Sequence, residues 1–556
     1  MQSTAGFRIS LCSRCNAEFQ PHTPRFPFSW DNLRSNYYPS SSEASRIYES
    51  MDDAKRELER YDEEINRARK SLEKLEEERG RLRKEMEGNQ GLLSPVRRLP
   101  SEILQSIFTF LSESEGYSLA ISKSGSVVHS PTFNLSRTST YWRRIVHSTP
   151  DLWRSISIDV IGLDGKRRLV RLVNAYLENS GQSPLNIQIT DDDFSPDDDQ
   201  YIISVGNTGL DVFKALVMHS ERWVKVDLRF RQDIFRMLET GSFQLPHLEE
   251  LSMQSIQLTT TIRAACSKTS TLRTLKVDGF TYYGIAFPYH TLQDLVVGEI
   301  KSCQLFLRML PLCNNLKSLR VDRFWATRDH GTLISASPSL PITCTFLERL
   351  SFTLTHWERL HMFFESLNFP ALTEIEITLS YGFDKSVWPS EDFVGMLRRS
   401  RCSLRRLKLF FCPLSDSYLL DLFRLMPDLE EFALEEVSWM TCVTPHLLTS
   451  LTLAPEDGIS STALLPKLKR LSIHCMKAWD YSDVAEVVVT MLESRRDERL
   501  LQTRQCSRLD EVSLSLYPED PIVGLNDPLH IHFGEEPLRR LGVLQDGGLR
   551  MGLTVE

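Results

Sequence analysis

A short leucine motif, Leu-x-x-Leu-x-apolar, recurs over most of this chain. One copy reads Leu248-Glu249-Glu250-Leu251-Ser252-Met253. Further copies open at Leu272, Leu292, Leu316, Leu347, Leu372, Leu404, Leu429, Leu448, Leu468 and Leu509, and an earlier variant opens at Trp223. Most openings are about 20 to 30 residues apart, a spacing typical of stacked repeats. The motif constrains the fold strongly, because each unit of a stacked repeat buries its apolar face only against its neighbours.

Successive side chains of an extended strand point to opposite faces, so the spaced leucines would enter a shared core while the residues between them face outward. The outward positions carry both signs of charge, which fits recognition of a protein. They include Asp278, Asp294, Asp322 and Arg349. The candidates for contact with a target protein are Lys276, Arg320, Arg406, Lys408, Arg470 and His474. The alternative is that most of these are ordinary solvated strand residues.

The motif resembles the leucine-rich-repeat family in a divergent form, since the asparagine or cysteine usual four residues beyond the motif is mostly absent. The resemblance implies an α/β solenoid over residues 156–530, with helices between the strands and irregular turns. A cap or tail is expected over residues 531–556. The fold class expected for the chain is an α/β solenoid preceded by a small all-α module and an N-terminal coiled-coil helix.

A second motif precedes the repeats. It opens as Leu99-Pro100-Ser101-Glu102-Ile103-Leu104-Gln105-Ser106-Ile107-Phe108-Thr109-Phe110-Leu111. It continues with Leu135-Ser136, Trp142-Arg143 and Pro150-Asp151-Leu152-Trp153. Pro100 suits the first turn of a helix, where its missing N–H is not needed, and the apolar residues that follow recur at helical spacing. The pattern predicts one amphipathic helix, two short helices and a trailing tryptophan.

This order of residues resembles the F-box, a small helical module that docks on a Skp-type adaptor and so joins a cullin-based ubiquitin ligase. The resemblance covers residues 92–155. It implies adaptor contact by Leu99, Pro100, Ile103, Leu104, Ile107, Phe108, Leu111, Leu135, Trp142 and Trp153. Residues 112–134 form an insert longer than the family usually carries, and Thr138-Ser139 stand where Val-Cys is common. The alternative is a helical hairpin whose apolar stripe is only core.

Residues 43–88 carry an apolar seam with alternating steps of four and three residues, which is the heptad spacing of a coiled coil. The seam consists of Ile47, Met51, Ala54, Leu58, Tyr61, Ile65, Ala68, Leu72, Leu75, Arg79, Leu82 and Met86. We expect this helix to form a homodimer, in which Arg79 would weaken the seam and fix its register. The alternative is a single solvated helix. Gly88, Asn89 and Gly91 are expected to end the helix.

Charges beside the seam favour parallel pairing. A parallel pair sets Glu64 against Arg69 and Glu78 against Arg83 of the other copy. An antiparallel pair would oppose glutamates instead. Glu57 opposite Asp62 is the one unfavourable contact of the parallel arrangement.

The first 42 residues are rich in proline, serine and aromatic residues and are expected to form a disordered tail. Cys12 and Cys15 lie in a Cys-x-x-Cys pair with His22 beyond, but a closed zinc site needs four ligands. Two free thiols, zinc shared between chains and a redox pair remain as alternatives. The acidic run Asp191–Asp199 lacks the spacing of a calcium loop, so a solvated loop is expected.

Composition excludes several functions. The formal net charge of −9 argues against a general nucleic-acid binder, and no apolar run has the length of a membrane span. Eleven irregularly spaced cysteines indicate a reducing compartment, either cytoplasm or nucleus. No signature of an enzyme is found, and no metal or cofactor is expected. The chain is therefore expected to be the substrate-recognition subunit of a cullin-type ligase. The alternative is a scaffold that oligomerises through its coiled coil and binds proteins with its repeats.

Overall fold

The computed structural model of the chain describes residues 8–12, 17–22, 30–122, 127–163, 165–190, 206–229, 243–253, 260–279, 287–300, 302–324, 341–354, 360–379, 388–437, 440–454, 463–475, 481–516 and 534–555. The chain divides into two compact units, Met1–Ile103 and Leu104–Glu556, which are described separately. Among the described residues, no helix combines the length and the apolar character that a membrane span requires.

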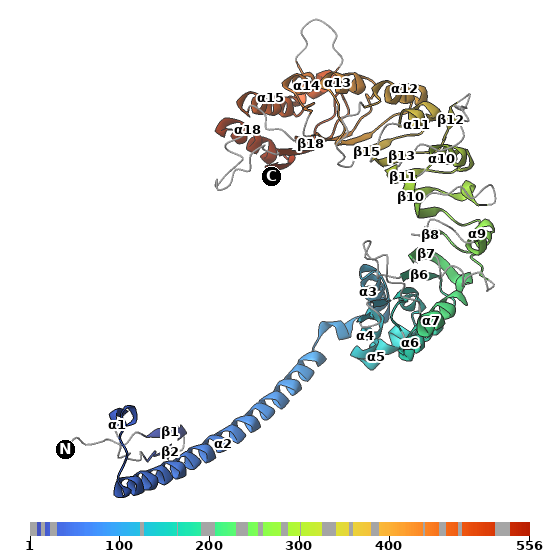
Figure 1. Cartoon of the computed structure of the whole chain (residues 1–556). Helices are drawn as coiled ribbons and strands as arrows, with labels where there is room; N and C mark the ends of the chain where they lie inside the picture. Colours follow the sequence, from blue (N-terminus) through green and yellow to red (C-terminus); the bar gives the residue numbers. More distant parts are fainter. Residues whose placement is uncertain are drawn as a thin grey trace. The chain divides into compact units, whose positions relative to one another are not determined.

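The first unit is organised around a long helix, α2 (Ser41–Leu92). An antiparallel hairpin, β1 (Ile9–Cys12) and β2 (Ala17–Phe19), and a short helix, α1 (Trp30–Arg34), precede it (Figure 1). Helix α2 begins after Ser40, whose backbone N–H donates to the Glu43 carboxylate at 2.9 Å. This bond satisfies one of the donors left unpaired at a helix N-terminus.

The end predicted for this helix is wrong. Gly88, Asn89 and Gly91 all lie inside α2, which continues to Leu92. A glycine inside a helix costs only about 1 kcal/mol, too little to stop a helix that continues on both sides. Pro95 stands near the observed end of α2, and proline cannot continue the backbone hydrogen bonds of a helix. The 3₁₀ turn η1 (Pro95–Arg98) begins at this residue.

Within residues 1–42, which were expected to form a disordered tail, the described residues include a hairpin that packs on α2. Phe19 is buried, and its ring centroid lies 4.8 Å from that of Tyr61. The backbone N–H of His22 donates to Glu57 Oε1 at 2.9 Å. These contacts join residues about 40 positions apart in the chain, which a composition argument does not detect.

The region with the F-box resemblance contains helices α3 (Ser101–Ser114), α4 (Pro131–Thr138) and α5 (Thr140–His147), and ends in the 3₁₀ turn η2 (Pro150–Trp153). The helices were expected, but an all-α module is wrong. The insert forms two strands, β3 (Leu119–Ser122) and β4 (Val127–His129), and β3 pairs in parallel with the first strand that follows η2.

The rest of the second unit is a large mixed sheet with helices. Within the described residues, sixteen strands pair in the order β20-β19-β18-β17-β16-β15-β13-β11-β10-β9-β8-β7-β6-β5-β3-β4, and β3–β4 is the only antiparallel pair among them. The strands from β5 onward are β5 (Ser155–Asp159), β6 (Leu185–Thr190), β7 (Trp223–Arg229), β8 (Glu250–Met253), β9 (Thr274–Gly279), β10 (Asp294–Ile300), β11 (Ser318–Phe324), β13 (Arg349–Leu354), β15 (Glu374–Leu379), β16 (Arg406–Phe410), β17 (Glu431–Glu435), β18 (Arg470–Cys475), β19 (Glu511–Leu516) and β20 (Arg550–Val555). Strands β12 (Ile342–Thr343) and β14 (Leu367–Asn368) form a separate pair.

Helices connect most of these strands and cover one face of the sheet (Figure 1). They are α6 (Arg167–Asn179), α7 (Asn207–Val217), α9 (Thr260–Ser267), α10 (Cys303–Met309), α11 (Leu360–Ser366), α12 (Ser390–Ser400), α13 (Asp416–Arg424), α14 (Pro445–Leu451), α15 (Tyr481–Ser494), α16 (Glu498–Arg504) and α18 (Glu535–Asp546). The short 3₁₀ turns are η3 (Ser220–Arg222), η4 (Tyr289–Thr291) and η5 (Leu310–Leu312).

The core of the sheet follows the leucine motif. In β16 the residues Leu407 and Leu409 are buried, whereas Arg406 and Lys408, which alternate with them, are half-buried on the other face. The copy that opens at Leu448 is the exception, because Leu448 lies in helix α14. Its Leu-x-x-Leu spacing also places two leucines on one helix face, so the motif alone does not separate the two structures.

Candidate functional site

Helix α3 has two apolar faces. Leu104 and Phe108 are 0% and 1% exposed, and the Phe108 ring centroid lies 4.8 Å from that of Trp142. Ile103, Ile107 and Leu111, spaced four residues apart, are 48%, 46% and 37% exposed. Phe110 beside them is 74% exposed. A contiguous apolar row on a solvent-exposed helix is typical of a protein docking surface. We call Ile103, Ile107, Phe110 and Leu111 the α3 outer row.

The residues that the resemblance assigned to adaptor contact therefore separate into different environments. Pro100, Ile103, Ile107 and Leu111 are exposed, and Leu99 and Trp142 are half-buried. Leu104, Phe108, Leu135 and Trp153 are buried. Trp153 is held inside, since its indole N–H donates to the Val146 carbonyl at 2.9 Å and its ring contacts Tyr176. The buried residues support the fold and do not offer a surface.

Sequence reasoning missed three exposed aromatic residues of this region. Phe110 lies in α3, Phe133 in the first turn of α4 and Tyr141 in α5, and all three are exposed. Each stands next to or between residues of the motif, and large aromatic side chains are frequent anchors of protein interfaces. The sequence signal that could have identified these three residues is therefore an aromatic side chain at a position that the motif does not specify.

The insert is tied to the sheet by a buried hydrogen-bond network around Tyr176 of α6. The Tyr176 hydroxyl donates to the Ser118 carbonyl at 3.0 Å and contacts the Ser130 hydroxyl. The hydroxyls of Ser112 and Ser118 lie 3.2 Å apart. Burial raises the pKa of Tyr176 to about 12, so the hydroxyl keeps its proton at neutral pH. The network joins α3, the insert and α6.

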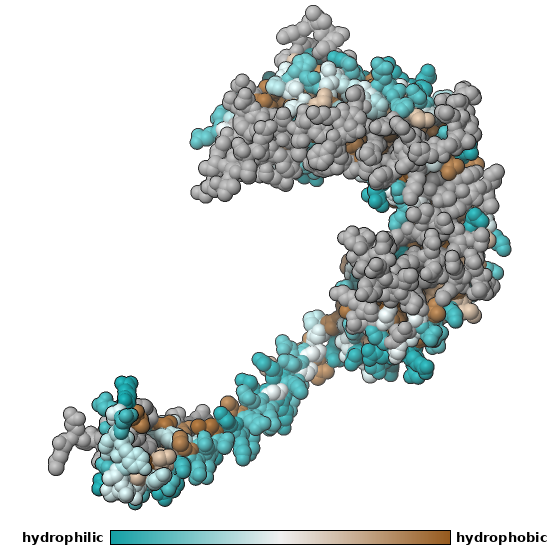
Figure 2. Space-filling model, viewed as in Figure 1, coloured by the Kyte–Doolittle hydropathy of each residue, from teal (hydrophilic) through white to brown (hydrophobic). Residues whose placement is uncertain are grey.

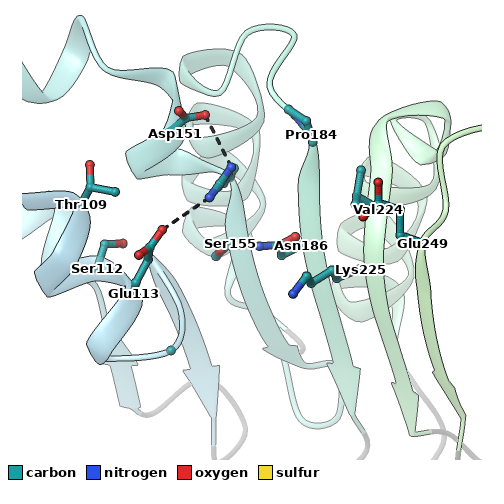
Figure 3. A pocket seen from close by; sticks show the side chains of 12 residues that line it. Thr109, Ser112, Glu113, Asp151, Ser155, Pro184, Asn186, Val224, Lys225 and Glu249 are labelled. Carbon is teal, nitrogen blue, oxygen red and sulfur yellow. Dashed lines mark hydrogen bonds and ion pairs between the residues drawn. The ribbon is translucent and has the colours of Figure 1, made fainter. Parts of the chain in front are cut away.

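A polar pocket of about 430 Å³ lies where the C-terminal half of α3 meets the first residues of β5, β6 and β7 (Figure 3). The Arg154 guanidinium stands between Glu113 at 3.6 Å and Asp151 at 3.8 Å. Lys225 and Glu249 add one charge of each sign to the lining. Because the lining carries both signs of charge and Arg154 is held between two carboxylates, the pocket favours neither a cation nor an anion.

Outward charges on the sheet alternate in sign from strand to strand. The first outward residue of each strand from β13 onward forms one row in register, which we call the charge ladder. Its members are Arg349, Glu374, Arg406, Glu431, Arg470, Glu511 and Arg550. Arg406 lies 2.5 Å from Glu374, Arg470 lies 2.5 Å from Glu431, and Arg550 lies 3.1 Å from Glu511.

The residues predicted to contact a target lie on the exposed face of the sheet, but most are paired with neighbours. Lys276 binds Glu250 at 2.8 Å, and burial of Glu250 is outweighed by Lys276 and Lys225, which lower the pKa of that carboxyl. Arg320 lies 2.6 Å from Asp322. Lys408 lies 3.9 Å from Glu376 and 3.7 Å from Glu431, and Arg406 and Arg470 belong to the charge ladder. His474 lies on β18, in register with Glu435 and Ser515.

No group of three or more histidine, cysteine or acidic side chains within the described residues could hold a metal ion. Cys15, the side chain of Cys12 and the acidic run 191–199 lie outside that description. The interpretations given above for these residues stay predictions.

Comparison with models of protein families gives one match, to the F-box-like family, over residues 96–159. The matched segment contains α3, the β3–β4 insert, α4, α5, η2 and strand β5. No curated protein matches the chain.

Proposed function

We propose that this chain is the substrate-recognition subunit of a cullin-type ubiquitin ligase, in which the F-box-like region docks on a Skp-type adaptor and the sheet binds a target protein. The observation that carries the proposal is the α3 outer row, which lies within the F-box-like segment and offers apolar side chains to a partner. In this role the chain performs no catalysis. It supplies proximity between the target and the ligase.

We also propose that the sheet and its helices form a divergent leucine-rich-repeat solenoid. From β5 to β20 the strands of the sheet stand in chain order with parallel register, and the leucines of the motif that lie in or before these strands are buried on the helix side. The target would then bind the exposed strand face, where Lys276, Arg320, Arg406, Lys408, Arg470 and His474 lie. The described cysteines are free thiols, which fits a reducing compartment, cytoplasm or nucleus.

The test is adaptor binding by the full chain, measured by calorimetry with a purified Skp-type adaptor. Replacing Ile107 and Phe110 by Ala removes two exposed anchors and should weaken binding by about 2–4 kcal/mol. The matched control replaces Met218 and Val543 by Ala. These are exposed apolar residues of α7's C-cap and of α18, outside the F-box-like segment. Both double variants should keep the melting temperature of the wild type.

Two outcomes would contradict the proposal. The first is a wild-type chain that does not bind the adaptor, and the second is an Ile107/Phe110 variant that binds it at wild-type affinity. A chain that fails to bind the adaptor yet self-associates would favour the alternative function, a scaffold that oligomerises through α2. Substitution of Leu104 or Phe108 is unsuitable here, because both are core residues and their loss would unfold the region.

A further inference from the structure

The heptad seam of helix α2 is covered in part near its N-terminal end and exposed beyond it. The seam has two columns, a (Met51, Leu58, Ile65, Leu72, Arg79 and Met86) and d (Ile47, Ala54, Tyr61, Ala68, Leu75 and Leu82). In the first half of the helix the d column is half-buried as far as Tyr61, whereas Met51 and Leu58 of the a column are exposed. Every residue from Ile65 to Leu93 is exposed. Figure 2 shows apolar residues in brown along this helix.

The β1–β2 hairpin accounts for the covering of the d column near Tyr61. Phe19 packs on Tyr61, and the Arg60 guanidinium lies 5.3 Å from the centre of the Phe19 ring. Glu57, which precedes Leu58 and flanks the seam, is only 6% exposed and accepts the hydrogen bond from the His22 backbone N–H. A partner helix cannot pack against the d column here while the hairpin is docked, because knobs-into-holes packing needs both columns.

Glu57 would also make an unfavourable contact in a parallel dimer that used the whole length of α2. In that pair Glu57 of one copy would face Asp62 of the other, two like charges. Docking of the hairpin withdraws the Glu57 carboxylate from this position. The remaining cross-pairs, Glu64 with Arg69 and Glu78 with Arg83, join opposite charges and lie beyond the hairpin.

We propose that a second copy of this chain docks in parallel on residues 64–86 of α2, and that the β1–β2 hairpin sets the N-terminal limit of this zipper. The occupant is a second copy because the exposed columns are self-complementary at heptad spacing and their flanking charges match only in the parallel arrangement. The zipper has about three heptads and carries Arg79 in its a column, so we expect dissociation in the micromolar range. The inference is independent of adaptor docking.

The first experiment uses two identical substitutions at equivalent positions of the full chain. Leu58 and Leu72 both occupy the a column and are 63% and 57% exposed. Leu72→Glu should weaken self-association at least about a hundredfold. Each copy loses a leucine that the dimer would bury, and the two glutamates that replace them are like charges facing each other. Leu58→Glu should self-associate like the wild type. Mass is measured by sedimentation equilibrium at tens of micromolar.

Three results would overturn the inference: a wild-type chain that is monomeric, equal disruption by both substitutions, or no disruption by Leu72→Glu. Helix content by circular dichroism should be the same in both variants, because glutamate is a good helix former. Adaptor affinity should be unchanged in Leu72→Glu. A failure of the adaptor proposal would therefore leave this result standing, and the reverse also holds.

The second experiment tests direction and limit by cysteine cross-linking. Ala54 and Ala68 both occupy the d column, two heptads apart. Under mild oxidation Ala68→Cys should form a disulfide with the same position of the second copy, identified by peptide mass spectrometry against the wild-type background. Ala54→Cys should not form this disulfide while the hairpin is docked. Adding Phe19→Ala, which releases the hairpin, should allow the disulfide at position 54 to form. A disulfide in Ala54→Cys with the hairpin intact would refute the limit, and absence of the disulfide in Ala68→Cys would refute parallel pairing.

Discussion

The charge ladder predicts that a single outward glutamate stabilises three strands. Glu431 of β17 accepts two hydrogen bonds from the Arg470 guanidinium, at 2.9 Å and 2.5 Å, and lies 3.7 Å from Lys408. Arg406 stands in register with it on β16. The Glu431 side chain is largely covered by these cations, so solvent screens the interactions less than at an open surface.

The change Glu431→Arg would place three arginines in consecutive positions of the ladder. An exposed ion pair contributes about 0.2–1 kcal/mol, so losing the pairs with Arg470 and Lys408 should cost about 1–2 kcal/mol. Like charges on neighbouring strands destabilise by a similar amount, which brings the expected loss to about 2–4 kcal/mol. Glu431→Gln removes the charge without adding repulsion and should cost about half as much.

The assay is urea unfolding of the full chain, followed by circular dichroism at low salt and at about 1 M NaCl, where the screening length falls to about 3 Å. The loss caused by Glu431→Arg should shrink at high salt. Phe432→Leu on the same strand is the control, because Phe432 points into the core and packing losses do not depend on screening. The reasoning is refuted if Glu431→Arg is no more destabilising than Glu431→Gln, or if salt leaves its effect unchanged.

Two further predictions concern the packing of the second unit. At Gly298 of β10, an added Cβ would lie 2.6 Å from the Asp278 carbonyl oxygen, so Gly298→Ala should cost about 1–3 kcal/mol in urea unfolding, whereas Gly552→Ala, with 3.7 Å to the Ser513 hydroxyl, should be neutral. Equal stability of the two would contradict the close approach of β9 and β10. Tyr176→Phe leaves the buried Ser118 carbonyl without its donor and should cost about 1–3 kcal/mol; wild-type stability of this variant would show that the network does not hold the insert.

The leucine motif located most strands because its information is local. Within each strand the buried leucines and the outward residues between them are encoded in six consecutive positions, and the opening leucines at Leu248, Leu272 and Leu292 are all buried. Strands β5, β6 and β20 lack the motif and were not predicted individually. Leu448 shows the limit of the rule, because the same spacing suits a helix face.

Features that depend on distant pairing were missed. The hairpin is held by Phe19 on Tyr61, and the insert by pairing of β3 with β5. Neither contact has a counterpart within a short window of sequence. The charge ladder was accessible in principle, since its members from Arg349 to Glu511 each stand two residues after a motif leucine. Comparing the second residue after each motif leucine from one repeat to the next gives the alternation of charge directly.

The F-box-like motif predicted helix α3 but not which of its apolar residues face outward. Five apolar residues in Ile103–Leu111 fit one stripe, yet α3 uses Leu104 and Phe108 for the core and Ile103, Ile107 and Leu111 for the surface. A helix that packs on one side and docks on the other is apolar on both. The hydrophobic pattern alone therefore cannot say which face is inside.

The insert gives the proposed receptor a mechanical property that the motif alone would not. Leu119 and Ile121 of β3 pair with Ile156 and Ile158 of β5, so the chain leaving α3 enters the same sheet that would bind the target. Tyr176 fixes both ends of the insert through Ser118 and Ser130. An adaptor bound to α3 would then be held at a fixed geometry to the sheet, whereas a flexible linker would spread the target over a large volume and lower its effective concentration. The insert therefore connects α3 to the sheet through paired strands.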